Sequence, residues 1–324
     1  MTRETRCMGL DLGGTNIKFG LVAPDGTCSE FHSVPTPSGS GPQAITEQLA
    51  ALISEAASKA SSQNLEIHGV GIGVPALTDS FNGILLNAPN LKIQNYPIAK
   101  AVQDICSIPV WIDNDANAML EGEAWLGSAQ GLNHAILLTL GTGVGGAILS
   151  SGEVNRGYRG VAGEIGHMVI DINGSKCGCG NHGCFEQYAS ATALVRIARE
   201  ILRFNGNKNK TSLVDNENLC ARDIFSASTG GDSVARYATD QFSEYLGIGI
   251  ANLVNIFNPE AVILSGGVVN AGAPLFDSVR TVVDKHTFKE DACAVSIIPA
   301  TFGDKGGVLG AARIAYRRLE DQGQ

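Results

Sequence analysis

Two glycine-rich turns, each set between apolar stretches, decide the fold of this chain. The first reads MGLDLGGTNIKFGLV (residues 8–22), and the second reads LTLGTGVGGAIL (residues 138–149). Apolar residues flank the glycines on both sides, a pattern typical of a β-hairpin. LDLGGT (residues 10–15) also aligns with LTLGTG (residues 138–143). A supersecondary unit that occurs twice indicates a duplicated architecture, and two such turns could hold one polyphosphate from both sides.

Strands and helices alternate along the rest of the chain. Apolar residues spaced three and four apart predict helices at residues 43–60, 115–126, 191–204, 233–257, 275–285 and 306–319. Short apolar runs predict strands at residues 67–74, 110–112, 135–140, 261–264 and 295–298, and an Asn- and Pro-rich loop is expected at about residues 75–96. This alternation is typical of an α/β fold. No Pro- or Ser-rich linker divides the sequence, so we expect its domains to be joined by hinges.

The composition is that of a folded globular enzyme, because 44% of the 324 residues are hydrophobic and only 17% are charged. A net charge of −9 without a long Lys/Arg run argues against binding to nucleic acid. The purest apolar run, residues 135–140, is far too short to cross a membrane, and residues 1–7 lack the apolar core of a secretory signal. We therefore expect a cytoplasmic protein without nucleic-acid or membrane partners.

The first glycine turn predicts a phosphate site. Adjacent glycines let backbone N–H groups point at phosphate oxygens, and a nearby carboxylate can hold a water bound to magnesium. The candidate residues are Asp11, Gly13, Gly14, Thr15, Asn16 and Lys18. A tight hairpin with a surface lysine explains this turn equally well, but the second turn, which contains Thr142 and Gly143, favours phosphate binding. Neither turn is a Walker A loop or a dinucleotide-binding fingerprint.

A polar cluster, DNDAN (residues 113–117), follows the apolar strand at residues 110–112. Binding sites in α/β sheets concentrate at such strand ends. A kinase needs a carboxylate to take the proton from the attacking hydroxyl, and Asp115 is the candidate for this base. The alternative is a cap on the helix at residues 115–126, although a capping residue can still be catalytic.

Three of the eight cysteines, Cys177, Cys179 and Cys184, lie in one glycine-rich turn. Together with one imidazole they fit a tetrahedral Cys₃His zinc site. The imidazole is that of His167, in the upstream motif EIGH (residues 164–167), or that of His182, within the turn. A redox pair or a disulfide is the alternative, but Cys-x-Cys spacing is tight for a disulfide and a reducing cytosol disfavours one. The remaining cysteines are expected to be buried thiols: Cys7, Cys28, Cys106, Cys220 and Cys293.

The stretch VILSGG (residues 262–267) is an apolar strand that runs into two glycines. Such a strand can let a nucleotide lie flat against the backbone, which makes Gly266 and Gly267 candidates for this contact. A plain turn explains the pattern equally well.

Together these motifs resemble the ROK family (repressor, open reading frame, kinase) of the actin-like sugar kinase superfamily. The resemblance covers nearly the whole chain. Its most specific part is EIGH (residues 164–167) followed by CGCGNHGCFE (residues 177–186). The run GCFEQYASAT (residues 183–192) is most similar to the bacterial glucokinase branch.

The resemblance implies a duplicated actin-like (ribonuclease H-like) fold of two domains with a cleft between them. A small domain would hold residues 1–118 and about 304–320, and a large domain, residues 119–303, would carry the zinc turn. Family members are commonly dimers or tetramers, so a homo-oligomer is implied. The cofactors implied are ATP with Mg²⁺ and a structural Zn²⁺.

The resemblance also implies a role for each motif. Asp115 would be the general base for the 6-hydroxyl of a hexose. The other sugar hydroxyls would bind Asn114, Glu164, His167 and Glu186, and zinc would bind His167 together with the three cysteines. The ATP phosphates would face residues 11–18 and 141–146, and the adenosine would face Gly266 and Gly267.

One departure from the family bears on the sugar. Many family glucokinases have a Trp shortly after an Asn-Leu pair, whereas here Asn90-Leu91 is followed by Lys92. We expect an ATP-dependent glucokinase. The alternatives are a kinase for N-acetylmannosamine, N-acetylglucosamine or fructose, and a sugar sensor without turnover. A DNA-binding repressor is not expected, because the phosphate hairpin begins at residue 8.

Overall fold

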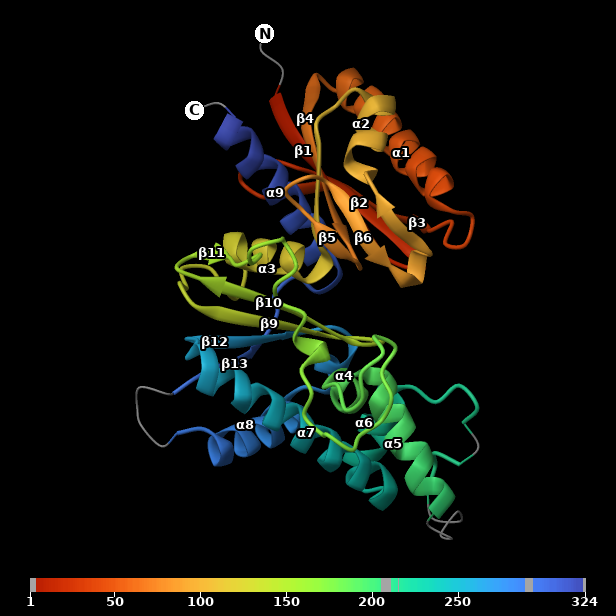
Figure 1. Cartoon of the computed structure of the whole chain (residues 1–324), viewed down its shortest axis with the longest axis vertical. Helices are drawn as coiled ribbons and strands as arrows, with labels where there is room; N and C mark the ends of the chain where they lie inside the picture. Colours follow the sequence, from red (N-terminus) through yellow and green to blue (C-terminus); the bar gives the residue numbers. More distant parts are fainter. Residues whose placement is uncertain (1–3, 205–210, 215, 289–293, 323–324) are drawn as a thin grey trace. The chain divides into compact units, whose positions relative to one another are not determined.

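The computed structural model describes residues 4–204, 211–214, 216–288 and 294–322 (Figure 1). The chain forms two compact units, of which the first takes Met1–Leu132, Ile148–Gly163 and Thr301–Gln324, and the second takes Asn133–Ala147 and Glu164–Ala300. The predicted domain limits, residues 1–118 with 304–320 and residues 119–303, stay a prediction. The first unit contains residues 119–132 and 148–163 as well.

The first sheet has the order β3-β2-β1-β4-β8. Its strands are β1 (Glu4–Leu12), β2 (Asn16–Val22), β3 (Cys28–Pro35), β4 (Leu65–Val74) and β8 (Val110–Asn114). β1, β2 and β3 are antiparallel neighbours, whereas β4 runs parallel to both β1 and β8. β1 and β2 form the hairpin predicted at residues 8–22.

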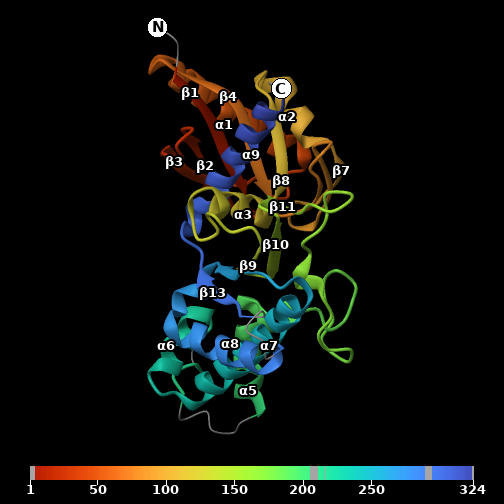
Figure 2. The same cartoon turned by 90° about the vertical axis from the view of Figure 1, so that its left-hand side faces the viewer.

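Helices cover both faces of this sheet (Figure 1). Residues Met8, Leu10 and Leu12 of β1 pack with α1 (Pro42–Ser62) and α2 (Ile98–Cys106) in one core. Alternate β1 residues face α9 (Gly306–Gln322), which packs through Val308 and Ala312 against Cys7. Figure 2 shows α9 running beside β1 and β4.

Close packing of α9 depends on two glycines of the sheet. A Cβ at Gly9 or at Gly71 would overlap the backbone carbonyl of Val308 or Ala311, respectively. The absence of side chains at these positions lets the helix lie directly on β1 and β4. Asp11 points to the same face, beside Gly307 in the first turn of α9.

The prediction of a loop at about residues 75–96 is wrong. Three short strands form an antiparallel sheet there, in the order β5-β6-β7: β5 (Leu77–Asp79), β6 (Ile84–Ala88) and β7 (Ile93–Tyr96). A 3₁₀ turn, η1 (Pro89–Leu91), joins the last two strands. Strands of three to five residues between Asn and Pro give too little apolar alternation to be recognised in sequence.

The second sheet repeats the arrangement of the first, in the order β11-β10-β9-β12-β13. Its strands are β9 (Ala135–Leu140), β10 (Val144–Ser150), β11 (Glu153–Val154), β12 (Ala261–Ser265) and β13 (Ser296–Pro299). β12 runs parallel to β9 and β13, as β4 runs parallel to β1 and β8. The duplicated α/β architecture predicted from the two glycine turns is therefore confirmed.

The second unit holds most of the remaining helices (Figure 1). They are α4 (Glu186–Ala189), α5 (Ala191–Phe204), α6 (Ala221–Thr229), α7 (Ser233–Phe257) and α8 (Ala273–His286). The predicted limits of α5 and α7 are confirmed, as are those of α3 (Asp115–Leu126) in the first unit. Among the described helices, none is both long and apolar enough to cross a membrane.

The scattered cysteines are not all buried. Cys7 is buried, Cys28 and Cys106 are partly buried, and Cys220 is exposed where α6 begins. The prediction of a buried thiol is thus wrong for Cys220, and Cys293 lies outside the described residues.

Candidate functional site

The first glycine turn joins β1 to β2 and keeps its polar groups near the surface. The Gly13 N–H donates to the Asn16 carbonyl at 2.9 Å, and a Cβ at Gly13 would meet that carbonyl oxygen at 2.8 Å. A glycine is therefore required for the chain to reverse here. Thr15 and Asn16 at the tip are exposed, and Lys18 is half-buried on β2.

Two acidic side chains lie beside this turn. Burial raises the pKa of Asp11 above its ordinary value, an effect that Lys18 opposes. The Lys18 ammonium pairs with the Asp304 carboxylate at 2.6 Å. Asp304 belongs to the 3₁₀ turn η6 (Gly303–Lys305), just before α9, and lies 286 positions from Lys18. Sequence reasoning missed Asp304, because a lone Asp before a helix gives no signal of its partner.

The polar cluster at residues 113–117 ends β8 and begins α3. Asn114 is the helix cap: its side-chain oxygen accepts the backbone N–H groups of Ala116 and Asn117 at 2.9 and 3.3 Å. Its Nδ2 donates to the Ala76 carbonyl at 3.3 Å. Asp115 is the first helical residue and is half-buried. Asn114 therefore caps the helix, and Asp115 Oδ1 also accepts the Ala116 N–H at 2.9 Å. Among the described residues, the Asn114 amide has one N–H left to donate.

The predicted metal ligands come together in the second unit. The ligand atoms of His167, Cys177, Cys179 and Cys184 all lie within 4.8 Å of one another. The sulfur atoms of Cys179 and Cys184 are 3.6 Å apart, and Cys177 Sγ is 3.7 Å from His167 Nδ1. Tetrahedral zinc with Zn–S bonds of about 2.3 Å and a Zn–N bond of about 2.0 Å needs separations of about 3.5 to 3.8 Å. The donor set and its spacing thus fit zinc, with His167 rather than His182 in the cluster.

Backbone hydrogen bonds shape the turn that presents the cysteines. The Cys177 N–H donates to the Asn181 carbonyl at 2.8 Å, and the Cys179 N–H points at the Cys177 sulfur at 3.5 Å. Gly183 has a φ of 71°, and a Cβ there would overlap the Asp171 carbonyl. Only glycine satisfies both constraints, so Gly183, next to Cys184, is part of the ligand geometry.

The three thiols differ in acidity. Burial raises the pKa of Cys177 to about 12 and also raises the pKa of Cys184. A hydrogen bond from the backbone N–H of Asn181 lowers the pKa of Cys179. Zinc binds thiolates, so a metal bound here must displace protons, and its affinity falls at acidic pH.

Two carboxylates flank the imidazole of His167. Glu164 Oε2 lies 3.8 Å from Nε2, and Glu186 Oε1 lies 3.9 Å from Nδ1. Glu186 also accepts the Cys177 S–H at 3.0 Å. Nδ1 faces the sulfur cluster, which leaves Nε2 directed towards Glu164. Burial raises the pKa of Glu164, and the imidazole opposes this rise.

The second glycine turn, between β9 and β10, lies against one of these carboxylates. A Cβ at Gly143 would come closer than 3.0 Å to Glu186 Oε2, whereas one at Gly141 would meet nothing within 4 Å. Thr142, between them, is exposed. Within the second unit, a predicted phosphate turn and a predicted sugar ligand are therefore in contact.

Two glycines follow the strand β12, and they differ in how tightly the chain packs around them. Gly266 has a φ of 95°, and a Cβ there would overlap the Leu140 backbone. Gly267 begins the 3₁₀ turn η4 (Gly267–Ala271) and borders a cavity of about 320 Å³. Arg222 and Phe225 of α6 also line this cavity.

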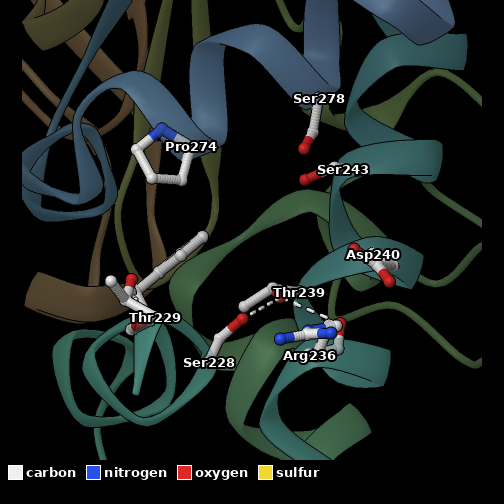
Figure 3. A pocket seen from close by; sticks show the side chains of 9 residues that line it. Ser228, Thr229, Arg236, Thr239, Asp240, Ser243, Pro274 and Ser278 are labelled. Atoms are coloured by element: carbon white, nitrogen blue, oxygen red, sulfur yellow. Dashed lines mark hydrogen bonds between the residues drawn. The ribbon is translucent and has the colours of Figure 1, made fainter. Parts of the chain in front are cut away.

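Figure 3 shows a second cavity, of about 310 Å³. It adjoins the first one, because Phe225 and Thr229 line both. Its walls come from α6, α7 and α8 and are rich in hydroxyl groups. The Ser228 and Thr239 hydroxyls are hydrogen-bonded at 3.0 Å, and Arg236 lies next to them. Sequence reasoning missed both cavities, because α6 itself was not predicted.

The sequence of this chain matches one protein family over nearly its whole length. The family model described as the ROK family matches residues 7–318. The chain belongs to the ROK family. It is 34% identical over 305 residues to the glucokinase of Halalkalibacterium halodurans, covering 94% of this chain and 92% of that protein. Identity to the Thermotoga maritima glucokinase is also 34%, over 322 residues, covering 98% and 99% of the two chains.

Solved ROK structures share this fold. A glucokinase from Streptomyces griseus, in complex with glucose and AMPPNP, has a TM-score of 0.83 at 32% identity and covers 96% of this chain and 99% of its own. A hexokinase from Thermus thermophilus has a TM-score of 0.82 at 33% identity, with coverage of 98% and 99%. The actin-like α/β fold implied by the resemblance is therefore confirmed.

The predicted site residues of this ROK protein divide between the two compact units. The first unit contains Asp11, Gly13, Gly14, Thr15, Asn16, Lys18, Asn114 and Asp115. The second contains Thr142, Gly143, Glu164, His167, Cys177, Cys179, Cys184, Glu186, Gly266 and Gly267. The roles of these residues in binding and catalysis stay predictions.

Proposed function

We propose that this protein is an ATP-dependent hexose kinase that phosphorylates the 6-hydroxyl of glucose. The observation that supports this most is the match, over nearly the full length of both chains, to two proteins named glucokinase. The structural relative from Streptomyces griseus holds glucose and the ATP analogue AMPPNP. We propose that this chain also binds a hexose and an adenine nucleotide.

The nucleotide would bind through both glycine turns. Thr15, Asn16 and Lys18 would donate to phosphate oxygens from the first turn, and Thr142 and the Gly143 backbone from the second. Asp11, half-buried beside Lys18, offers the carboxylate that a magnesium-bound water requires. Magnesium would neutralise charge on the transferring phosphoryl group.

The adenosine would lie against Gly266 and Gly267. The cavity of about 320 Å³ beside Gly267 supports this proposal, because it offers Phe225 as an apolar surface and Arg222 and Asn270 as polar groups. Pockets with this mixture are typical of small-molecule sites.

The hexose would be held by Asn114, Glu164, His167 and Glu186, with Asp115 as the general base. Asp115 would orient the 6-hydroxyl and take its proton as the phosphoryl group is transferred. The remaining amide N–H of Asn114 and the Nε2 atom of His167 are donors and acceptors suited to sugar hydroxyls. Glu164 and Glu186 add carboxylate acceptors, which make the stronger, charge-assisted hydrogen bonds.

The metal at the Cys₃His cluster would be a structural zinc. Cys177, Cys179, Cys184 and His167 Nδ1 would hold it, which would fill all four positions of a closed site. Zinc bound there would fix the orientation of the imidazole, so that its second nitrogen points at the sugar. The chemistry of phosphoryl transfer is left to Asp115 and the nucleotide.

A second candidate is a kinase for N-acetylmannosamine, N-acetylglucosamine or fructose. This candidate is favoured by the sequence after Asn90-Leu91, where many glucokinases of the family have a Trp and this chain has Lys92. Lys92 adopts a left-handed backbone conformation with a φ of 56°. A sugar sensor without turnover is the remaining alternative, since the chain is also 34% identical to a putative xylose repressor of Caldicellulosiruptor, covering 94% of this chain and 76% of that protein.

The assay that separates these candidates is ATP-dependent ADP release over a panel of sugars. Zinc should be measured on the same sample. The proposal predicts the highest kcat/KM with glucose and about one zinc per chain. Higher kcat/KM with an N-acetylated sugar or fructose would support the second candidate, and sugar binding without ADP release would support the sensor. We also propose a cytoplasmic homo-oligomer, a dimer or tetramer, that feeds sugar into glycolysis.

A further inference from the structure

A chain of five alternating charges runs through the first unit and begins at Asp113, two positions before the proposed base. In order, its members are Asp113, Arg156, Glu121, Arg317 and Glu153. Arg156 Nε lies 2.6 Å from Asp113 Oδ2, and Arg156 Nη2 lies 2.8 Å from Glu121 Oε1. Arg317 continues the chain to Glu121 at 3.2 Å and then to Glu153.

The inner end of this chain is withdrawn from water. The side chains of Asp113 and Glu121 are 1% and 3% exposed, and that of Arg156 is 17% exposed. Arg156 is thus the cation shared by two buried carboxylates. Buried charges are stable only when they are paired and hydrogen-bonded. Loss of the guanidinium would remove the cation that pairs with Asp113 and leave Glu121 paired with Arg317.

The Asp113 carboxylate orients the backbone on which Asp115 sits. Its Oδ1 accepts the Asn114 backbone N–H at 2.8 Å and the Asn117 side-chain amide at 2.9 Å. Arg156 occupies the other oxygen. The Oδ1 atom therefore fixes two points of the junction between β8 and α3, the Asn114 backbone and the Asn117 side chain, with Asp115 between them. The Oδ2 atom ties the same carboxylate to Arg156.

We propose that Arg156 is a positioning residue for Asp115 and acts through Asp113. The inference rests on the proposed kinase function, in which Asp115 is the general base. Arg156 holds the carboxylate that holds the Asn114 backbone, and this sets the direction in which the Asp115 side chain leaves the first turn of α3. Arg317 shares Glu121 with Arg156, but in the described part of the chain it forms no ion pair with Asp113, so it supports the chain of charges without this effect.

The test compares Arg156→Gln with Arg317→Gln in the full-length zinc-bound protein. Both variants remove one guanidinium from Glu121, so both should lower the melting temperature. Arg156→Gln should also lower kcat for the sugar about 10- to 100-fold, since misplacing a catalytic group by 1 Å costs about 100-fold. Its KM for ATP should stay within about twofold, because the phosphate turns are elsewhere on the chain.

Further variants keep the inference testable if Arg156→Gln folds poorly. Arg156→Lys retains the charge but cannot bond both carboxylates with the same fork, so kcat should be intermediate. Asp113→Asn should lower kcat about as much as Arg156→Gln, and the double variant should be no worse than either single one, because both break the same link.

The kinetic pattern decides the outcome. Equal loss of kcat in Arg156→Gln and Arg317→Gln would overturn the inference, because it would reflect general destabilisation. Unchanged kcat in Arg156→Gln, or fully additive losses in the double variant, would also overturn it. If the wild-type protein phosphorylates no sugar of the panel, the proposed function itself fails, and that result is visible before any variant is made.

Discussion

The contact between the second glycine turn and Glu186 predicts that Gly143→Ala weakens sugar binding. The new Cβ would come closer than 3.0 Å to Glu186 Oε2, a separation that real Cβ atoms essentially never show, so one of the two groups must move. The carboxylate is the end of a flexible side chain, so it can retreat by about 1 Å at little cost to folding. That retreat would remove the carboxylate from the position in which we propose that it accepts a sugar hydroxyl.

The magnitude follows from the bond that is lost. A hydrogen bond to a charged group contributes about 1.5 to 3 kcal/mol, so the dissociation constant for the sugar should rise about 10- to 150-fold. Isothermal titration calorimetry with the sugar, in the absence of nucleotide, measures this directly. The melting temperature should change by about 2 °C or less, because the fold itself is not strained.

Gly141→Ala is the matched control in the same turn. A Cβ there meets nothing within 4 Å, so sugar affinity without nucleotide should stay within about twofold of the wild type. The reasoning is refuted if Gly143→Ala binds sugar as tightly as the wild type. It is equally refuted if Gly141→Ala weakens sugar binding to the same extent.

Three further predictions concern the metal, the phosphate turn and the core. Cys179→Ser should lose the zinc and weaken sugar binding more than ATP binding, whereas Cys220→Ser, outside the cluster, should change neither; metal analysis and calorimetry check both. Burial raises the pKa of Asp11 above 3.8, so the folded state binds more protons there. At pH 7 the wild-type carboxylate is ionised and buried, so Asp11→Asn should raise the melting temperature; below about pH 4 the carboxyl is protonated and the two proteins should melt alike. Asp11→Asn should also abolish turnover, because it removes the carboxylate proposed to hold the magnesium-bound water. The buried Tyr316 hydroxyl bonds the backbones of β1 and β2, so Tyr316→Phe should cost about 1 to 3 kcal/mol in urea unfolding, and Tyr158→Phe, 94% exposed, almost nothing.

Local sequence predicted the parts of the molecule whose residues lie close together in the chain. The three cysteines of the metal cluster fall within eight positions, so their spacing alone restricts them to one turn. The limits of α7 could be predicted because its apolar residues are regularly spaced and Asn258-Pro259 follows its last residue. The two hairpins were recognisable because glycines interrupt strong apolar alternation.

Pairings that depend on distant parts of the chain could not be predicted. Arg156 and Asp113 are 43 positions apart, and Lys18 and Asp304 are 286 apart. An isolated Arg or Asp carries no sign of its partner, since the pair exists only after the elements have packed. The sheet β5-β6-β7 and the helix α6 were missed for a different reason: their apolar residues are too few for either periodicity to be distinct.

The central claim is that Asp115 is the base of an ATP-dependent hexose kinase, and the formation of glucose 6-phosphate from ATP and glucose by the wild type and Asp115→Asn tests it most directly. We expect turnover by the wild type and a kcat lower by about 100- to 10,000-fold in the variant. Calorimetry should show that the variant still binds glucose, because Asn retains the size and polarity of the side chain. Near-normal turnover in Asp115→Asn would contradict the account.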